Sequence, residues 1–140
     1  MNIKEILEIL PHRYPILLVD RVVTQTENTI ESFKNITVNE DVFNGHFPTN
    51  PIYPGIYQIE GMAQSAALLV ANTIEDFNKK TVFFLGIDKC KFRKPVIPGD
   101  KLTYKIELIK KRRNICSFIG KCYVDDILVS QAELKATIVD

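Results

Sequence analysis

The chain has 140 residues, of which 46% are hydrophobic and 25% charged, and its formal net charge is +1. This length suits one domain spanning residues 1–140, and the composition is typical of a globular protein. No apolar run approaches the ~18 residues of a membrane span, and charged residues interrupt the N-terminal apolar stretch, so we expect no membrane insertion, no secretory signal and a cytoplasmic location. The three cysteines are expected to be reduced, and no His/Cys cluster has metal-ligand spacing, so we expect no metal and no cofactor.

The first predicted element is a short amphipathic helix at the N-terminus. Asn2 and Glu5 have the spacing of a capping pair, and Pro11 ends the helical pattern. Between them, apolar residues recur at helical spacing: Ile3, Ile6, Leu7 and Leu10. A strand pair is then predicted over residues 17–24 and 29–38, with a polar turn between the strands.

Residues 39–54 show no periodicity. Irregular segments of this length are usually functional or disordered, and this one is too rich in proline and apolar residues for disorder. Good helix formers without an internal proline then predict one long helix over residues 54–77. Small residues dominate one stripe of that helix, which predicts close packing against a sheet: Ile56, Glu60, Ala63, Gln64, Ala67 and Ala71.

The remainder of the chain predicts four strands, over residues 81–93, 101–108, 114–124 and 128–138. Turn residues separate them, as at Pro98–Asp100 and Asp125–Asp126. The order of elements predicts an α+β fold, in which a six-stranded, mostly antiparallel sheet packs against one long helix, with a short N-terminal helix besides.

His46 is the first candidate for chemistry, in the stretch GHFPTNPIYPG. A loop histidine is most often hydrogen-bonded or solvent-facing. Here three prolines restrict the backbone and apolar neighbours can exclude water, which favours a buried and oriented imidazole. Its ordinary pKa near 6.5 suits a general base at neutral pH.

Glu60 is the second candidate. It could simply be a surface glutamate in the first turns of a helix. Its apolar stripe instead predicts desolvation, which would raise the pKa of the carboxyl and keep it protonated as a proton donor. A neutral base and a neutral acid in one dry pocket are what a β-elimination of water requires.

The amides of Gly55 and Ile56 are the third candidate. Near a helix start they lack intrahelical acceptors and can hold a polarised carbonyl oxygen. A glycine that merely permits a tight turn is an equally good interpretation of Gly55. Ser65 has no GxSxG context, and His12, flanked by prolines, is expected to be structural.

The charge is unevenly distributed along the chain. Residues 79–113 contain twelve Lys or Arg against three Asp or Glu, which is a local charge of +9. This asymmetry suggests an acidic partner, although lysines that coat the solvent face of strands would look the same. No aromatic-interleaved basic motif favours nucleic acid.

Five blocks of the chain, in order and with consistent spacing, resemble the FabZ-type (3R)-hydroxyacyl-(acyl carrier protein) dehydratases of the hotdog superfamily: LPHRYPILLVDRV (10–22), GHFPTNPIYPG (45–55), IEGMAQ (59–64), KFRKPVIPGD (91–100) and AELKATIVD (132–140). The resemblance implies a sheet wrapped around the long helix. It implies a homodimer with active sites at the interface, commonly assembled as a trimer of dimers.

The resemblance also implies roles for individual residues. His46 would remove the C2 proton, Glu60 from the other subunit would protonate the departing hydroxyl, and the Gly55 N–H would bind the thioester oxygen. The substrate tunnel would be lined by Phe47, Ile56, Tyr57, Gln64, Phe83 and Phe84, with core packing the simpler role for the last two. The acidic acyl carrier protein, with its phosphopantetheine-linked substrate, would dock on Arg93, Lys94, Lys110, Lys111, Arg112 and Arg113.

Two departures from the family pattern bear on the alternatives. Thr49 stands where a glycine is usual, and Tyr57 and Gln58 replace an aliphatic pair, so loop geometry and tunnel shape are left open. A hotdog thioesterase is the competing enzyme, and a non-catalytic acyl-binding or carrier-binding module is the competing non-enzyme. The retained His46 and Glu60 favour dehydration.

Overall fold

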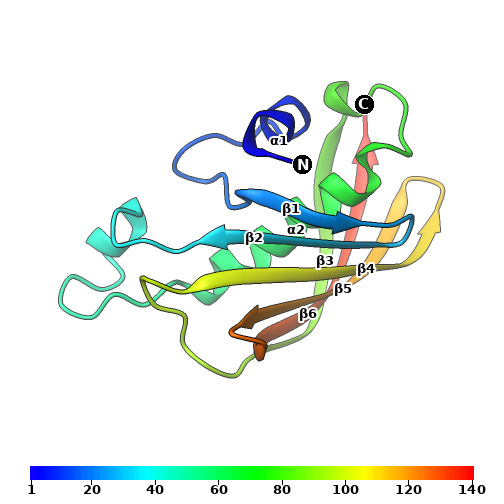
Figure 1. Cartoon of the computed structure of the whole chain (residues 1–140). Coiled ribbons are helices and arrows are strands. Elements are labelled where there is room, and N and C mark those ends of the chain that lie inside the picture. Colours follow the sequence, from blue (N-terminus) through cyan, green and yellow to red (C-terminus); the bar gives the residue numbers. More distant parts are fainter.

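The computed structural model describes all 140 residues as one sheet with a helix against it (Figure 1). The helix α2 crosses the concave side of the sheet. No helix of the structure is both long enough and apolar enough to cross a membrane. The elements in chain order are α1 (Ile3–Ile9), β1 (Arg21–Gln25), β2 (Thr29–Asn35), η1 (Asp41–Asn44), α2 (Gly55–Ala71), η2 (Phe77–Lys79), β3 (Thr81–Phe92), β4 (Lys101–Arg112), β5 (Ile115–Val124) and β6 (Ile127–Val139).

The sheet has six strands in the order β1-β2-β4-β5-β6-β3, and every neighbouring pair is antiparallel. The predicted fold class is therefore confirmed. Strand β3 lies at one edge of the sheet, beside β6. It is far from β2 in the strand order, although β2 and β3 come directly before and after the α2 region in sequence. One long edge of β3 has no strand beside it.

The N-terminal helix forms as predicted, with both halves of a capping box. The Asn2 side chain accepts hydrogen bonds from the Lys4 and Glu5 N–H groups, and the Glu5 carboxylate accepts one from the Asn2 N–H. These bonds satisfy N–H groups that have no acceptor within the helix. Beyond the helix, the Arg13 guanidinium donates to the carbonyls of Leu7, Leu10 and His12 and so fixes the segment after α1.

Residues 17–20 do not belong to β1, which begins only at Arg21, so the predicted start of the strand is wrong. Leu18 and Val19 are buried, as a strand pattern suggested, but the backbone bonds of Leu18 leave the sheet. The Leu18 N–H donates to the Gln64 side chain on α2, and its carbonyl accepts from the Tyr104 hydroxyl. Burial without ladder pairing produces the same sequence pattern as a strand.

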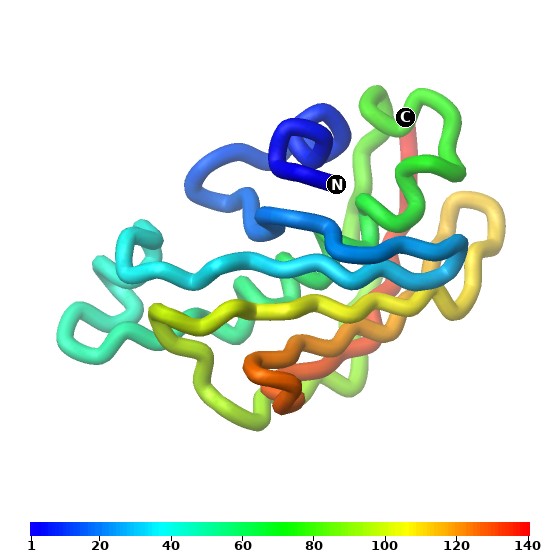
Figure 2. The backbone as a smooth tube through the Cα atoms, viewed as in Figure 1, coloured from blue at the N-terminus to red at the C-terminus, as the bar shows by residue number.

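Helix α2 ends at Ala71, six residues before the predicted end at position 77. Asn72 caps it, and the Thr73 backbone and hydroxyl both donate to the Val70 carbonyl. Such local side-chain bonds compete with the helical ladder, and asparagine, threonine and isoleucine propagate helices weakly. A turn and the short η2 fill the distance to β3 (Figure 2).

The face of α2 that contacts the sheet is not the predicted stripe. Gly61 lies under the Tyr104 ring, Met62 lies against Gly120, and the Ser65 hydroxyl bonds to Ser32 at 2.7 Å. The predicted stripe turns instead toward solvent at Ile56, which is 75% exposed, and toward a cavity further along. Small residues on a helix can mark an open space as well as a close contact.

Strand β3 leaves large apolar side chains uncovered on both faces. Phe83 and Phe84, which point to opposite faces of the strand, are 54% and 42% exposed. Leu85 and Ile87 are similarly exposed. Core packing of Phe83 and Phe84 within one chain is therefore wrong.

We predict that Gly61→Ala destabilises the fold by about 1–3 kcal/mol, because the added methyl group would overlap the Tyr104 hydroxyl that is bonded to Leu18. Denaturant unfolding at a fixed protein concentration measures this loss. The matched control is Gly45→Ala, whose methyl group would meet nothing within 4 Å and whose φ of −118° suits alanine. Equal stability of the two variants would contradict the close contact of α2 with β4.

Candidate active site

The loop around His46 is held by its own backbone. The His46 N–H donates to the Val42 carbonyl at 2.9 Å, and the Ile52 N–H donates to the His46 carbonyl at 3.1 Å. The imidazole Nδ1 lies 2.7 Å from the Ile52 carbonyl oxygen. Because a carbonyl only accepts, Nδ1 carries the proton of the neutral ring and Nε2 has a free lone pair. The predicted orientation of the imidazole is therefore found in the structure, and its role as a base stays a prediction.

The predicted burial of His46 is only partly met within one chain. The imidazole is half-buried, and the Phe47 ring stacked on it at a centroid distance of 4.0 Å is itself 46% exposed. Tyr53, by contrast, is buried in the core beneath the loop. The loop is therefore anchored on one side and open on the other.

Two amides at the start of α2 have no acceptor in the chain. The N–H groups of Tyr57 and Gln58 donate to the Pro54 carbonyl, whereas those of Gly55 and Ile56 make no hydrogen bond. A Cβ at Gly55 would lie 2.6 Å from the Phe92 ring, so close packing as well as the helix start favours glycine there. The oxyanion role of Gly55 stays a prediction.

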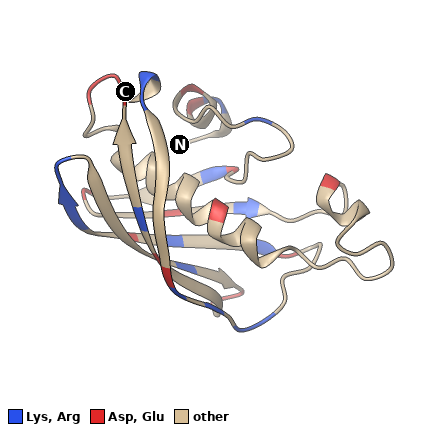
Figure 3. Ribbon diagram, turned by 180° about the vertical axis from the view of Figure 1, so that it is seen from behind, with Lys and Arg blue, Asp and Glu red and all other residues tan.

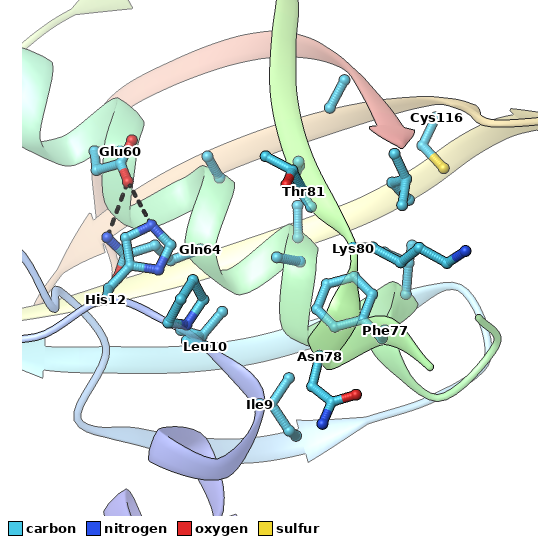
Figure 4. Close-up of a pocket in the computed structure, with 18 of the residues that line it drawn as sticks. Ile9, Leu10, His12, Glu60, Gln64, Phe77, Asn78, Lys80, Thr81 and Cys116 are labelled. Atoms are coloured by element: carbon cyan, nitrogen blue, oxygen red, sulfur yellow. Dashed lines mark hydrogen bonds and ion pairs between the residues drawn. The ribbon is translucent and has the colours of Figure 1, made fainter. Parts of the chain in front are cut away.

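Glu60 points toward the segment that follows α1 (Figure 4). Its Oε1 accepts a hydrogen bond from Gln64 Nε2 at 3.0 Å and lies 3.3 Å from His12 Nε2. Burial raises the pKa of the Glu60 carboxyl, but the hydrogen bonds from His12 and Gln64 and the charge of His12 outweigh burial, so the pKa is lowered. The predicted rise of the Glu60 pKa is wrong in the single chain.

Sequence reasoning missed this role of His12. We expected a structural residue, yet its ring lies at the carboxyl of Glu60, 48 residues away in sequence. The only sequence signal was the LPHRYP block itself, which gives no indication of what its histidine meets. Gln64, predicted as a tunnel residue, is almost fully buried and joins the same cluster.

A cavity of about 500 Å³ extends from this cluster between α2 and the sheet. Its polar end contains His12, Glu60 and Gln64. Most of the remaining wall is apolar, and includes Leu10, Ala67, Val70, Phe118, Leu134 and Ile138. The volume and lining suit an aliphatic chain whose polar end stops at Glu60.

The cavity of one chain does not include His46. Of the six predicted tunnel residues, Gln64 and Phe84 line it, whereas Phe47, Ile56 and Phe83 do not. Tyr57 also lies outside it and packs edge-on against Tyr53 at 5.8 Å. The base and the acid thus belong to separate parts of a single chain, and a tunnel that joins them stays a prediction about an assembly.

Comparison with known proteins shows which family has this sequence. A family model described as a FabA-like domain matches residues 10–133. The dehydratase FabZ of Campylobacter fetus, named 3-hydroxyacyl-(acyl-carrier-protein) dehydratase, is 51% identical over the whole of this chain and 99% of its own length. This chain belongs to the FabZ family. The FabZ of Helicobacter hepaticus is 47% identical, over the whole chain and 90% of that relative.

Solved structures show that this FabZ-family chain has the hotdog fold. The dehydratase heterocomplex ApeI:P of Xenorhabdus doucetiae has a TM-score of 0.80 at 18% identity, covering 96% of this chain and 91% of the other. A hypothetical thioesterase of Streptococcus pneumoniae, solved with coenzyme A, has a TM-score of 0.66 at 13% identity, with 85% and 84% covered. One of these neighbours is named a dehydratase and the other a hypothetical thioesterase, so the fold alone does not choose between the two activities.

The two basic groups predicted to dock a partner lie at opposite ends of the sheet. Phe92 is level with Tyr104 across the ladder, through Ser130 and Cys122. Arg112 is eight residues further along β4, which corresponds to roughly 26 Å at about 3.3 Å per residue. Arg93 and Lys94 lie next to Phe92, whereas Lys110–Arg112 form the end of β4 and Arg113 lies in the turn to β5; Figure 3 shows the Lys and Arg of this hairpin tip in blue.

We predict that the two histidines of this FabZ-family chain are opposite tautomers at a pH where both are neutral. His46 should carry its proton on Nδ1, which donates to the Ile52 carbonyl, and His12 on Nε2, which donates to the Glu60 carboxyl. Nitrogen-15 chemical shifts with two-bond proton correlations distinguish the tautomers. The same tautomer in both rings would contradict one of the two hydrogen-bond assignments.

Proposed function

We propose that this chain dehydrates (3R)-3-hydroxyacyl thioesters on acyl carrier protein to trans-2-enoyl thioesters, in fatty acid biosynthesis or the synthesis of a related acyl chain. Membership of the FabZ family supports the reaction class. The observation that most supports a site for it here is the largely apolar cavity whose polar end contains Glu60. The near-complete coverage of FabZ relatives supports the whole reaction.

The chemistry follows from the two side chains. His46 Nε2 removes a proton from C2, the C3–O bond breaks as Glu60 gives its proton to the hydroxyl, and water leaves as the C2–C3 double bond forms. The Gly55 N–H, which makes no hydrogen bond in the chain, would stabilise the negative charge that develops on the thioester oxygen. No external oxidant or reductant is needed.

A second copy of the chain would complete the site. His46 is absent from the cavity that contains Glu60, and β3 has both an unpaired edge and uncovered apolar side chains on either face. Exposed edges and apolar patches of this kind are usually covered in the working protein. We propose a homodimer that joins β3 to its counterpart and brings His46 of one subunit to Glu60 of the other. A trimer of dimers stays a prediction from the family.

We predict that His46→Ala and Glu60→Gln each lower the dehydration rate by about 10² to 10⁴, because each removes one partner of the proton transfers. Mixed after joint refolding, the two inactive variants should regain roughly a quarter of wild-type activity, since half of the random dimers hold one intact site of two. The rate of enoyl formation, followed in the near ultraviolet, measures both.

The outcome separates the possible arrangements. No recovery on mixing, in dimers shown to be heterodimers, would contradict a shared site. Rates within a few fold of wild type for either single variant would contradict the assigned role. Release of free acid and thiol in place of the enoyl product would favour the thioesterase alternative, and tight binding of acyl carrier protein without turnover would favour the non-catalytic module.

Of the two basic groups, we propose that Arg93 and Lys94 receive the acyl carrier protein. The neighbouring Phe92 ring packs on Gly55, and the Tyr53 N–H donates to the Val96 carbonyl at 2.8 Å, so this loop lies beside the His46 segment. Lys110–Arg113 lie at the far end, where Lys111 donates to Thr73. A carrier protein whose phosphopantetheine arm reaches the His46 loop would therefore lie closer to Arg93 and Lys94 than to Lys110–Arg113.

We predict that Arg93→Glu with Lys94→Glu raises KM for carrier-bound substrate several-fold and leaves short thioester analogues unaffected, because reversed charge repels an acidic carrier. Steady-state kinetics with both substrates measure the difference. The matched double variant Lys110→Glu with Arg112→Glu makes the same change in charge at the other end and should have the smaller effect. Equal effects of the two double variants would contradict the assignment.

A further inference from the structure

Both neighbours of the Glu60 carboxyl contact the same oxygen. Gln64 Nε2 and His12 Nε2 lie 3.0 Å and 3.3 Å from Oε1. Oε2 has no hydrogen-bond partner in the chain. The carboxyl is therefore asymmetric before any substrate is present, and the proposed reaction, in which it acts as the acid, makes no use of His12.

The Gln64 amide cannot turn over so that its oxygen and nitrogen change places. Its oxygen accepts from the Leu18 N–H at 2.8 Å, and Nε2 donates to the Ile16 carbonyl at 2.8 Å as well as to Glu60. Both N–H bonds and the oxygen are engaged, and the side chain is 1% exposed. The donor to Glu60 is fixed by three contacts that come from two segments of the chain.

Only one nitrogen of the His12 ring can form a hydrogen bond within the chain. Its Nδ1 is buried and has no hydrogen-bond partner, so Nε2 is the only ring nitrogen that meets another polar group. A proton on Nδ1 would be a buried donor without an acceptor, which is costly. The neutral ring therefore donates from Nε2 to Glu60, and the bonds of Arg13 to the surrounding carbonyls hold its backbone.

We propose that His12 is a positioning residue that, with Gln64, reserves Glu60 Oε1 as an acceptor, so that Oε2 holds the proton that is given to the substrate hydroxyl. This role rests on the dehydration proposed above. In a protonated carboxyl one oxygen is a donor and the other still accepts. A proton on Oε1 would face two N–H donors, whereas a proton on Oε2 faces the substrate.

His12 keeps its own proton throughout. Glu60 Oε2–H gives its proton to the hydroxyl as the C3–O bond breaks, and the carboxylate that remains is stabilised by the two donors on Oε1. The same contacts lower the pKa of Glu60, because they stabilise its ionised form. The proposed step therefore uses the protonated fraction of the carboxyl, in which the proton lies on Oε2. His12 thus stabilises the Glu60 carboxylate that forms when the proton has been transferred.

No other ionisable side chain in the cavity wall donates a hydrogen bond to Glu60. Besides His12 and Glu60, the wall contains Glu8, Arg13, Lys80 and Cys116. Arg13 is bonded to backbone carbonyls, and Lys80 is paired with Asp140. Of these side chains, only His12 contacts the Glu60 carboxyl.

The test compares His12→Phe, which keeps a ring without a donor, with His12→Gln, whose amide can donate in place of Nε2. His12→Phe should lower kcat about tenfold to a hundredfold, a smaller loss than removal of the acid itself. Its Glu60 pKa should rise, because burial remains and one donor is lost, whereas His12→Gln should return both values toward wild type. Carbon-13 NMR of the Glu60 carboxyl, assigned with Glu60→Gln, measures the pKa without substrate.

Distinct results overturn distinct claims. An unmoved Glu60 titration in His12→Phe, with wild-type protein active, would overturn this role and leave the dehydration intact. A wild-type protein that forms no enoyl product would overturn both. If His12→Phe does not fold, His12→Leu replaces it, and a kcat loss that His12→Gln fails to restore in folded protein would reduce His12 to a packing residue.

Discussion

The buried amide of Gln64 is the contact on which the site depends. It joins α2 to residues 16–18 and, through its second N–H bond, orients the Glu60 carboxyl. Loss of one partner of a buried hydrogen bond costs about 1–3 kcal/mol, because the other partner is left without water or protein contact. A single side chain therefore links the position of the N-terminal segment, and hence of His12, to the geometry of the acid.

The sheet imposes a second constraint, since α2 packs closely on it with one face and borders a cavity with another. Gly61, Met62 and Ser65 contact β4, β5 and β2 directly. On another face of the helix, alanines line a cavity whose opposite wall comes from β3, β5 and β6. Small side chains leave this space on one face of the helix, while the residues on the adjoining face pack against the sheet.

Much of the fold could be predicted from local pattern. The capping pair at Asn2 and Glu5, the alternation in β4 and the turn residues between strands each act over a few residues, and each element formed where its pattern indicated. The errors lay at boundaries and faces. Leu18 and Val19 are buried like strand residues but bond to Gln64 and Tyr104, and α2 ended early because Thr73 bonds back to Val70.

What the sequence determined by itself was the set of local tendencies and the family, and it predicted His46 and Glu60 as a pair. Only the tertiary structure decided that the Glu60 pKa is lowered, that His12 meets it, and that the basic residues divide between two ends of the sheet. Those results depend on contacts between segments dozens of residues apart. Desolvation and hydrogen bonding at a carboxyl are properties of such contacts, so no local pattern of residue types specifies their balance.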